Sequence, residues 1–344
     1  MLPLMLTGGA AGGIGEESGA EATEIPIAEI GDIGIGQAED AAAGTGCTVL
    51  VCPGGMRAGV DIRGGGPASR ETPLLNPLMA AQAIHAIVLA GGSAYGLDAA
   101  GGVMRCLEAR DIGFDVGVAK VPLVAQSDIF DLTVGDVSVR PDGDMGYEAA
   151  RRALDQPNYR DGSYGAGCGA TVGKINGMDT CMKSGIGSYA LRLGPLKIGA
   201  IVVVNALGDV FDWRTGRQLA GLLTDDKAAL RSTARFMRQS LAVKENKFAG
   251  NTTLAVVVTN ADLDKSRLCK IAGMGQDGLA RSIQPVHTTA DGDTVYAVSV
   301  GNVAADQDLV GTLAAEVVSE AISRAVMSAQ SAYGFPCAGD FIKK

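Results

Sequence analysis

The stretch IGAIVVVN at residues 198–205 and the stretch TTLAVVVT at residues 252–259 decide the fold. Both are rich in β-branched side chains, which favour strands. Both are apolar at successive positions rather than at alternate positions, so each strand must be covered on its two faces. The run AIVLA at residues 86–90 has the same character. The sequence therefore predicts strands that lie inside the molecule.

The remaining segments supply the layers that cover these strands. Further strands are predicted at residues 47–52 and 294–300, and periodic apolar patterns predict helices over 226–241, 264–283 and 306–329. Gly is frequent at 49 residues while aromatic residues make up only 4%, so the core is expected to consist of small aliphatic side chains between tight turns. A layered α/β protein with helices outside is the expected class. Residues 1–24 are expected to form a flexible arm, and residues 25–344 a single domain.

Composition excludes several kinds of function. The net charge of −9 comes without a basic stripe, so nucleic acid is not an expected partner. No apolar run approaches the roughly 18 residues of a membrane span, and the first residues do not resemble a signal peptide. The seven Cys show no C-x-x-C spacing and there are only two His, which argues against disulfides and metal sites. The expected location is the cytoplasm.

Two glycine-rich motifs invite familiar interpretations that their spacing does not support. The run GGSAYG at residues 91–96 lacks the Gly that a nucleophile elbow needs two residues after Ser93, because Tyr95 is there. Ser93 and Tyr95 are therefore only weak candidates for a substrate pocket, on a turn whose backbone N–H groups suit an anion. Lys174 follows Gly173 as in a phosphate loop, but the earlier Gly is replaced by Cys168. Nucleotide binding is therefore not expected.

The segment before the strand at residue 252 has the features of a processing site. Residues 225–250 are polar and basic and end in VKENKFAG, which is typical of an exposed connector. The core strand follows at once. An exposed loop that runs directly into a core strand is a favourable place for cleavage of the chain.

Long stretches of the chain resemble a known family. They are GNTTLAVVVTNADLDKSRL from residue 250, RSIQPVHTTADGDTVYAVSV from residue 281, DIRGGGPASRETPLL from residue 61, LAGGSAYGLDAAGGV from residue 89, GAGCGATVGK from residue 165 and IVVVNALGDV from residue 201. Their combination and order resemble the self-processing aminopeptidases, which include the L-aminopeptidase/D-amidase-esterase, the β-peptidyl aminopeptidases and the nylon-oligomer hydrolases. The resemblance implies an αββα four-layer sandwich, related to that of the ornithine acetyltransferases.

The resemblance also implies a specific cut and a specific set of site residues. Autocleavage between Asn251 and Thr252 would give chains of residues 1–251 and 252–344, with Thr252 as the nucleophile. Lys174 matches a lysine near the nucleophile, and Asn205 matches the asparagine of the oxyanion hole. The acidic pair that orients the nucleophile is matched by Asp291 and Asp293.

One position departs from the family pattern. Related hydrolases carry a Tyr where this chain has Phe130, so the pocket lacks a phenolic donor. Direct transfer of nylon-oligomer specificity to this chain is therefore in doubt.

Elementary chemistry supports the same hypothesis. A Thr hydroxyl is a weak nucleophile that needs an adjacent base, and cutting the chain before Thr252 creates one. The freed α-amino group has a reference pKa of about 7.7–8.0, so it can accept the proton of its own hydroxyl at neutral pH. Gly250 is expected to permit a strained backbone before the cut.

The expected function is hydrolysis of small peptides or amides through an acyl-enzyme, without metal or cofactor, in a homo-oligomer such as the tetramers of relatives. Two alternatives stay open: an acyltransferase of the ornithine acetyltransferase type, and an uncut, non-catalytic binding protein.

Overall fold

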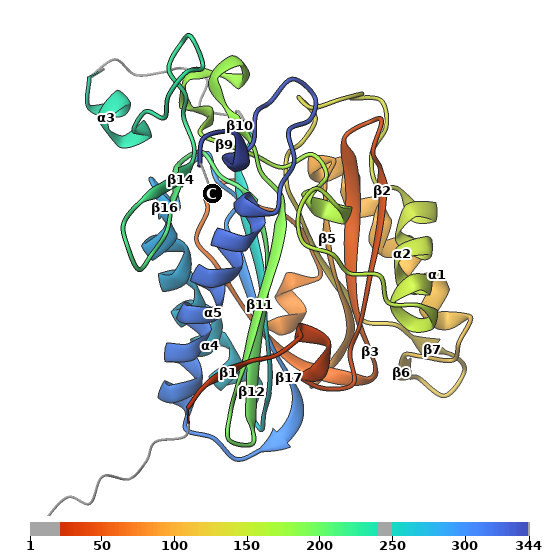
Figure 1. Cartoon of the computed structure of the whole chain (residues 1–344). Coiled ribbons are helices and arrows are strands. Elements are labelled where there is room, and N and C mark those ends of the chain that lie inside the picture. Colours follow the sequence, from red (N-terminus) through yellow and green to blue (C-terminus); the bar gives the residue numbers. More distant parts are fainter. Residues whose placement is uncertain (1–20, 240–249, 343–344) are drawn as a thin grey trace, which may run out of the picture.

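The computed structural model describes residues 21–239 and 250–342. Its main strands follow one path, β1-β11-β12-β15-β17-β3-β5-β8-β4, with β2 beside β3. The path folds into two layers of strands that face each other, with helices on the two outer sides (Figure 1). The first layer holds β1 (Thr23–Glu24), β11 (Ile186–Leu193), β12 (Leu196–Asn205), β15 (Thr252–Ala261) and β17 (Thr294–Val303). The second layer holds β2 (Gly34–Asp40), β4 (Ala68–Arg70), β5 (Ile84–Ala90) and β8 (Val124–Asp128).

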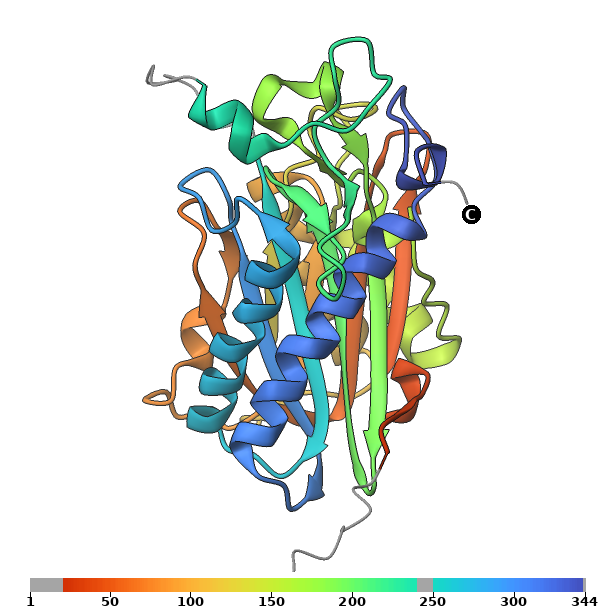
Figure 2. The same cartoon turned by 60° about the vertical axis from the view of Figure 1, so that its left-hand side comes forward.

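One long strand, β3 (Thr45–Ile62), belongs to both layers. Its residues 57–62 pair with β17, while its residues 45–51 pair with β2 and 47–51 with β5. Helices α4 (Lys265–Ser282) and α5 (Gln307–Met327) cover the first layer, and α1 (Ala99–Glu108) and α2 (Gly143–Asp155) cover the second (Figures 1 and 2). The molecule is therefore the αββα sandwich that the family resemblance implied.

Smaller elements connect these layers. The short helix α3 spans Thr233–Arg238. The short strands are β6 (Phe114–Asp115), β7 (Lys120–Val121), β9 (Thr171–Val172), β10 (Met182–Lys183), β13 (Asp209–Phe211), β14 (Gln218–Ala220) and β16 (Ile283–Gln284). The 3-10 helices are η1 (Ile27–Glu29), η2 (Thr72–Leu75), η3 (Ser93–Asp98), η4 (Gly165–Gly167), η5 (Lys174–Asn176), η6 (Met178–Thr180) and η7 (Ala338–Asp340).

Three apolar clusters explain why the central strands are apolar on both faces. In β12, Ala200 and Val202 point to the cluster beneath α4 and α5, while Ile201 and Val203 point to the cluster between the two layers of strands. A third cluster lies between the second layer and α1 and α2. Burying an aliphatic side chain of this size contributes about 1.5–3 kcal/mol, so these alternating positions fix the strands between their neighbours.

The structure confirms most of the predicted elements. The predicted strands coincide with parts of β3, β5, β12, β15 and β17. The helices predicted at 264–283 and 306–329 are α4 and α5, and the carboxylates of Asp264 and Asp306 each accept a backbone N–H of the first turn. Such N-caps satisfy donors that a helix start leaves free. No helix within residues 21–239 and 250–342 is long and apolar enough to cross a membrane.

Two boundaries need correction. The helix predicted over 226–241 was wrong at its start, because only α3 is helical in the part that the structure describes. The Thr224 hydroxyl donates to Asp226 across 2.6 Å, and this local turn replaces the first helical turns. The arm predicted over residues 1–24 is also too long at its end, since Thr23 and Glu24 form β1 and pair with β11. The rest of the arm, to residue 20, lies outside the described residues.

Candidate active site

Strand register brings the predicted nucleophile and the predicted oxyanion residue together. The last residue of β12, Asn205, is the antiparallel partner of Thr252, the first residue of β15. β17 runs parallel to β15 and begins at Thr294, directly after Asp293. Asn205 and Thr252 are both buried, with exposed fractions of 0% and 4%. The predicted residues therefore meet at one end of the first layer, below the surface.

The peptide bond predicted to be cut is held from two sides. The Thr252 hydroxyl donates to the carbonyl oxygen of Asn251 across 2.5 Å. The backbone N–H of Gly292 donates to the same oxygen across 2.8 Å. A Cβ at Gly292 would lie 2.7 Å from Thr252 Oγ1, so the hydroxyl occupies space that only glycine leaves free. A further pairing between Asn251 and Asp291 holds this turn beside the start of β15.

Lys174 lies in the same cluster. It begins η5, directly after Gly173, whose φ of 78° favours glycine. Its ammonium donates to three oxygens: the carbonyl of Asn205 at 3.0 Å, the side-chain oxygen of Asn205 at 2.8 Å and the carbonyl of Gly250 at 3.0 Å. Burial lowers the pKa of Lys174 to about 7. The protonated and neutral amines are therefore both populated near neutral pH.

The side-chain amide of Asn205 is fixed at both ends. Its oxygen accepts from Lys174 and from the backbone N–H of Thr171 at 3.0 Å. Its nitrogen donates to the carbonyl oxygens of Phe130 at 3.0 Å and Gly250 at 3.3 Å. These bonds settle the orientation of the amide and direct one of its N–H groups toward Gly250, in the main chain that precedes the predicted cut.

Gly250 is needed here for a reason that the sequence did not indicate. A Cβ at this position would lie 1.8 Å from Cγ of Phe130, so the glycine is required by close packing against the aromatic ring. The expected strained backbone is not observed, since Gly250 is absent from the residues with positive φ. The predicted pocket residue Phe130 is thus in the site, in contact with the segment that leads to the cut.

The two aspartates have different partners. Asp293 Oδ1 accepts the backbone N–H of Thr253 at 2.7 Å, next to the nucleophile. Asp291 accepts the hydroxyl and the backbone N–H of Thr288, at 2.5 and 2.8 Å. Burial, and then the nearby charge of Asp293, raises the pKa of Asp291 to about 6. Asp291 therefore holds the turn at Thr288, and Asp293 holds the start of β15 next to Thr252.

Sequence reasoning missed two residues of this site. Gly292 lies between the two aspartates and acts through its backbone N–H, which leaves no mark in a sequence. His287 contacts Asp293 through its ring, with Nδ1 and Oδ2 2.9 Å apart. The run HTTADGD contains both residues together with the acidic pair, so the signal was present in the motif but its inner contacts were not.

The predicted pocket residues Ser93 and Tyr95 are not part of this cluster. Ser93 begins η3, and its N–H donates to the carbonyl of Ile129. Tyr95 is exposed, with the guanidinium of Arg140 4.1 Å from the centre of its ring. Among the described residues, neither side chain hydrogen-bonds to Thr252 or its neighbours. The anion site expected on this turn is also taken at Gly92, whose N–H binds the carboxylate of Asp131 at 2.7 Å.

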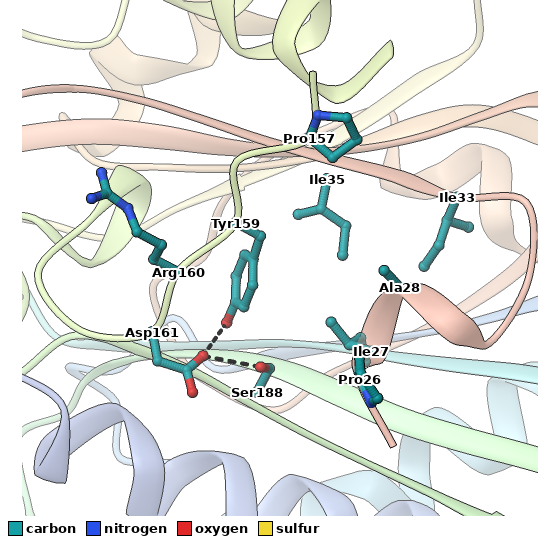
Figure 3. A pocket seen from close by; sticks show the side chains of 10 residues that line it. All are labelled: Pro26, Ile27, Ala28, Ile33, Ile35, Pro157, Tyr159, Arg160, Asp161 and Ser188. Atoms are coloured by element: carbon teal, nitrogen blue, oxygen red, sulfur yellow. Dashed lines mark hydrogen bonds between the residues drawn. The ribbon is translucent and has the colours of Figure 1, made fainter. Parts of the chain in front are cut away.

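A prominent apolar cavity of about 510 Å³ belongs to another part of the molecule. Figure 3 shows Tyr159 and Ser188 converging on Asp161, to which they donate at 2.8 and 3.0 Å. Arg160 also lines the cavity, and the remaining lining is apolar: Pro26, Ile27, Ala28, Ile33, Ile35 and Pro157. None of the residues that line it is one of the predicted site residues, so the cavity does not mark the chemistry.

Comparison with known proteins agrees with this geometry. Residues 25–337 match the family described as peptidase family S58. An uncharacterized aminopeptidase of Mycobacterium leprae is 39% identical over 312 residues, which cover 85% of this chain and 84% of the relative. A 6-aminohexanoate-oligomer endohydrolase of Agromyces sp. is 32% identical over 308 residues, which cover 85% of this chain and 83% of the relative.

Solved structures share the fold at lower sequence identity. A β-aminopeptidase of a Burkholderia species has a TM-score of 0.63 and 19% identity, covering 91% of this chain and 90% of that one. The L-aminopeptidase D-Ala-esterase/amidase of Ochrobactrum anthropi has a TM-score of 0.65 and 16% identity, covering 88% and 86%. The latter is described as a variant of the Ntn hydrolase fold.

Proposed function

We propose that this chain cuts itself before Thr252 and then uses Thr252 as its nucleophile. The proposal starts from its family: the chain belongs to peptidase family S58 and is an aminopeptidase or amidohydrolase that acts on C–N bonds. The observation that carries the proposal is the Thr252 hydroxyl resting 2.5 Å from the Asn251 carbonyl oxygen, which also accepts the Gly292 N–H. Reacting group, scissile carbonyl and an oxyanion donor thus already lie together in the uncut chain.

Self-cleavage would begin with attack of the Thr252 oxygen on the carbonyl carbon of Asn251. Negative charge then develops on the carbonyl oxygen, where the Gly292 N–H receives it. The C–N bond breaks, the nitrogen gains a proton and becomes the Thr252 amine, and Asn251 is left as an ester on the Thr252 oxygen. Water hydrolyses this ester to the Asn251 carboxylate and the free hydroxyl.

A base must take the hydroxyl proton in the uncut chain, where the Thr252 nitrogen is still an amide. We assign the role of this base to Lys174. Burial lowers its pKa to about 7, so the ammonium can lose a proton near neutral pH, and its Nζ lies 3.0 Å from the Gly250 carbonyl oxygen, one residue before the scissile bond. After the cut, the Thr252 α-amine takes over as the base for its own hydroxyl.

Turnover would use the same end of the strands. The Thr252 oxygen attacks the carbonyl of a small peptide or amide, the amine product leaves, and water releases the acyl group. Departure of the new carboxyl end at Asn251 would free the Asn205 amide nitrogen from the Gly250 carbonyl, so it can donate to the oxyanion of the substrate. Amide oligomers of the kind named for the Agromyces relative are one substrate class to test.

The test is turnover by the wild type beside Thr252→Ala, with aminoacyl p-nitroanilides and linear 6-aminohexanoate oligomers as substrates. Release of p-nitroaniline or shortening of the oligomers by the wild type alone would support the proposal. Equal rates for the two proteins would rule out Thr252 as the nucleophile.

We also propose that the protein is cytoplasmic and assembles into a homo-oligomer, of which a tetramer is one form to test. All seven cysteines are free thiols, which suits a reducing compartment. Size-exclusion chromatography with light scattering gives the mass of the assembly, and a single-chain mass of 35.0 kDa would contradict oligomerisation.

A further inference from the structure

His287 is linked through the side chain of Asp293 to Thr253, the residue that follows the nucleophile. The carboxylate of Asp293 accepts the Thr253 N–H on Oδ1 at 2.7 Å. On Oδ2 it accepts the backbone N–H of His287 at 3.0 Å and contacts the His287 ring nitrogen Nδ1 at 2.9 Å. Asp293 and Thr253 have exposed fractions of 1% and 0%, so water does not compete for these bonds. One buried carboxylate therefore joins the histidine to the strand start that presents Thr252.

The protonation of the imidazole follows from its partner. An ionised carboxylate only accepts hydrogen bonds, so Nδ1 of His287 must carry a hydrogen. The other ring nitrogen, Nε2, is buried and has no hydrogen-bond partner among the residues that the structure describes. Among the described residues, Asp293 is therefore the hydrogen-bond partner of the imidazole ring, through Nδ1.

The backbone of His287 is also unusual. Its φ is 55°, in the left-handed region that only a few per cent of residues other than Gly adopt, although His is found there more often than most. Such conformations persist where the surroundings hold them, and they gather at functional sites. Here the backbone N–H and the ring nitrogen of one residue, in this conformation, both contact the same carboxylate oxygen.

We propose that His287 is a positioning residue for the Thr252 chemistry: it fixes the rotamer of Asp293, which in turn fixes the main chain at Thr252 and Thr253. The inference rests on the proposed function of Thr252 and adds to it a residue that touches neither substrate nor scissile bond. Loss of the Nδ1 contact leaves Asp293 Oδ2 with the backbone N–H of residue 287 as its remaining partner in this group, so the carboxylate is held less firmly beside the Thr253 N–H. Misplacement of a reacting group by about 1 Å costs roughly 100-fold in rate.

Three substitutions separate positioning from a general structural role. His287→Ala removes the donor and should slow both self-cleavage and turnover by roughly 10- to 100-fold, through kcat with little change in KM. His287→Asn places an amide N–H where Nδ1 was and tolerates positive φ, so it should restore most of the rate. His287→Gln places its amide one bond farther out and should not.

The matched control is the other histidine of the chain. His85 is buried, and its Nδ1 accepts the N–H of Leu123 at 3.1 Å, near the start of β5. His85→Asn should leave both rates unchanged. The proteins are compared by denaturing mass spectrometry during cell-free synthesis and by steady-state kinetics of the folded, cut fraction.

Loss of rate in His287→Ala and His287→Gln with recovery in His287→Asn is the expected result. Wild-type rates in His287→Ala, or equal rates in the Asn and Gln variants, would overturn the proposal. If His287→Ala does not fold, the comparison between Asn and Gln still decides. A wild-type chain that stays uncut and inactive would instead refute the proposed function of Thr252, so the two failures are distinguishable.

Discussion

Adding one methyl group at Gly292 should slow self-cleavage by about 100-fold. In Gly292→Ala the new Cβ would lie 2.7 Å from Thr252 Oγ1 and 3.0 Å from the carbonyl oxygen of Gly66. Ordinary contacts of this kind begin near 3.4 Å, so the hydroxyl or the turn must move by about 0.7 Å. A displacement approaching 1 Å of a reacting group costs roughly 100-fold in rate.

The assay is a time course of cell-free synthesis, with the fraction of cut chain read by denaturing mass spectrometry. Gly66→Ala is the matched control: Gly66 lies in the loop between β3 and β4 that contacts the turn of Gly292, its N–H donates to the Asp291 carbonyl, and a Cβ there would be 4.0 Å from its nearest neighbour. The control should cut at the wild-type rate. Wild-type cutting by Gly292→Ala, with an unchanged melting temperature, would refute the role given to the Thr252 hydroxyl and its surroundings.

Three further results are expected. Asn205→Ala should lower kcat of the cut enzyme by roughly 10²–10³-fold, which is the usual effect of losing an oxyanion donor. Self-cleavage should be slowed less, because the Gly292 N–H stabilises the oxyanion in that step. Equal losses in turnover and in self-cleavage would contradict this assignment of separate oxyanion donors to the two steps. Gly250→Ala should block self-cleavage, because its Cβ would lie 1.8 Å from the ring of Phe130. Adding Phe130→Ala should restore part of the rate, which densitometry of the cut and uncut bands on a denaturing gel measures. Because its lowered pKa means that Lys174 loses its proton near pH 7, the rate of self-cleavage should rise with pH and level off above about pH 7. Lys174→Met should cut slowly at every pH. A rate of self-cleavage that falls from pH 6 to pH 8 would exclude the neutral Lys174 amine as the base.

Much of the fold could be predicted because its physical causes are local. Apolar residues on both faces of 198–205 and 252–259 require cover on two sides, and the structure places them between helices and a second layer of strands. The helices beginning after Asp264 and Asp306 carry recognisable N-caps. The helix expected from residue 226 failed because a Thr224–Asp226 hydrogen bond favours a turn there, and periodicity does not register such competition.

The site was predictable only as far as its side chains form motifs. Thr252 and Asn205 were found by resemblance, and their antiparallel pairing explains why residues far apart in sequence act together. Two groups escaped prediction: the Gly292 N–H, because backbone donors carry no sequence signature, and the ring of His287, because its partner becomes clear only in three dimensions. Packing of Gly250 against Phe130 likewise depends on an approach between distant segments.

The most direct test of the account is the intact mass of the purified protein under denaturing conditions, beside Thr252→Ala. Cleavage between Asn251 and Thr252 predicts two chains of about 25 and about 9–10 kDa, from 35.0 kDa shared in proportion to length, with the smaller chain beginning at Thr252. The variant should remain whole at 35.0 kDa. A wild-type chain that stays whole for days at neutral pH, or a variant that is cut at the same place, would contradict the account.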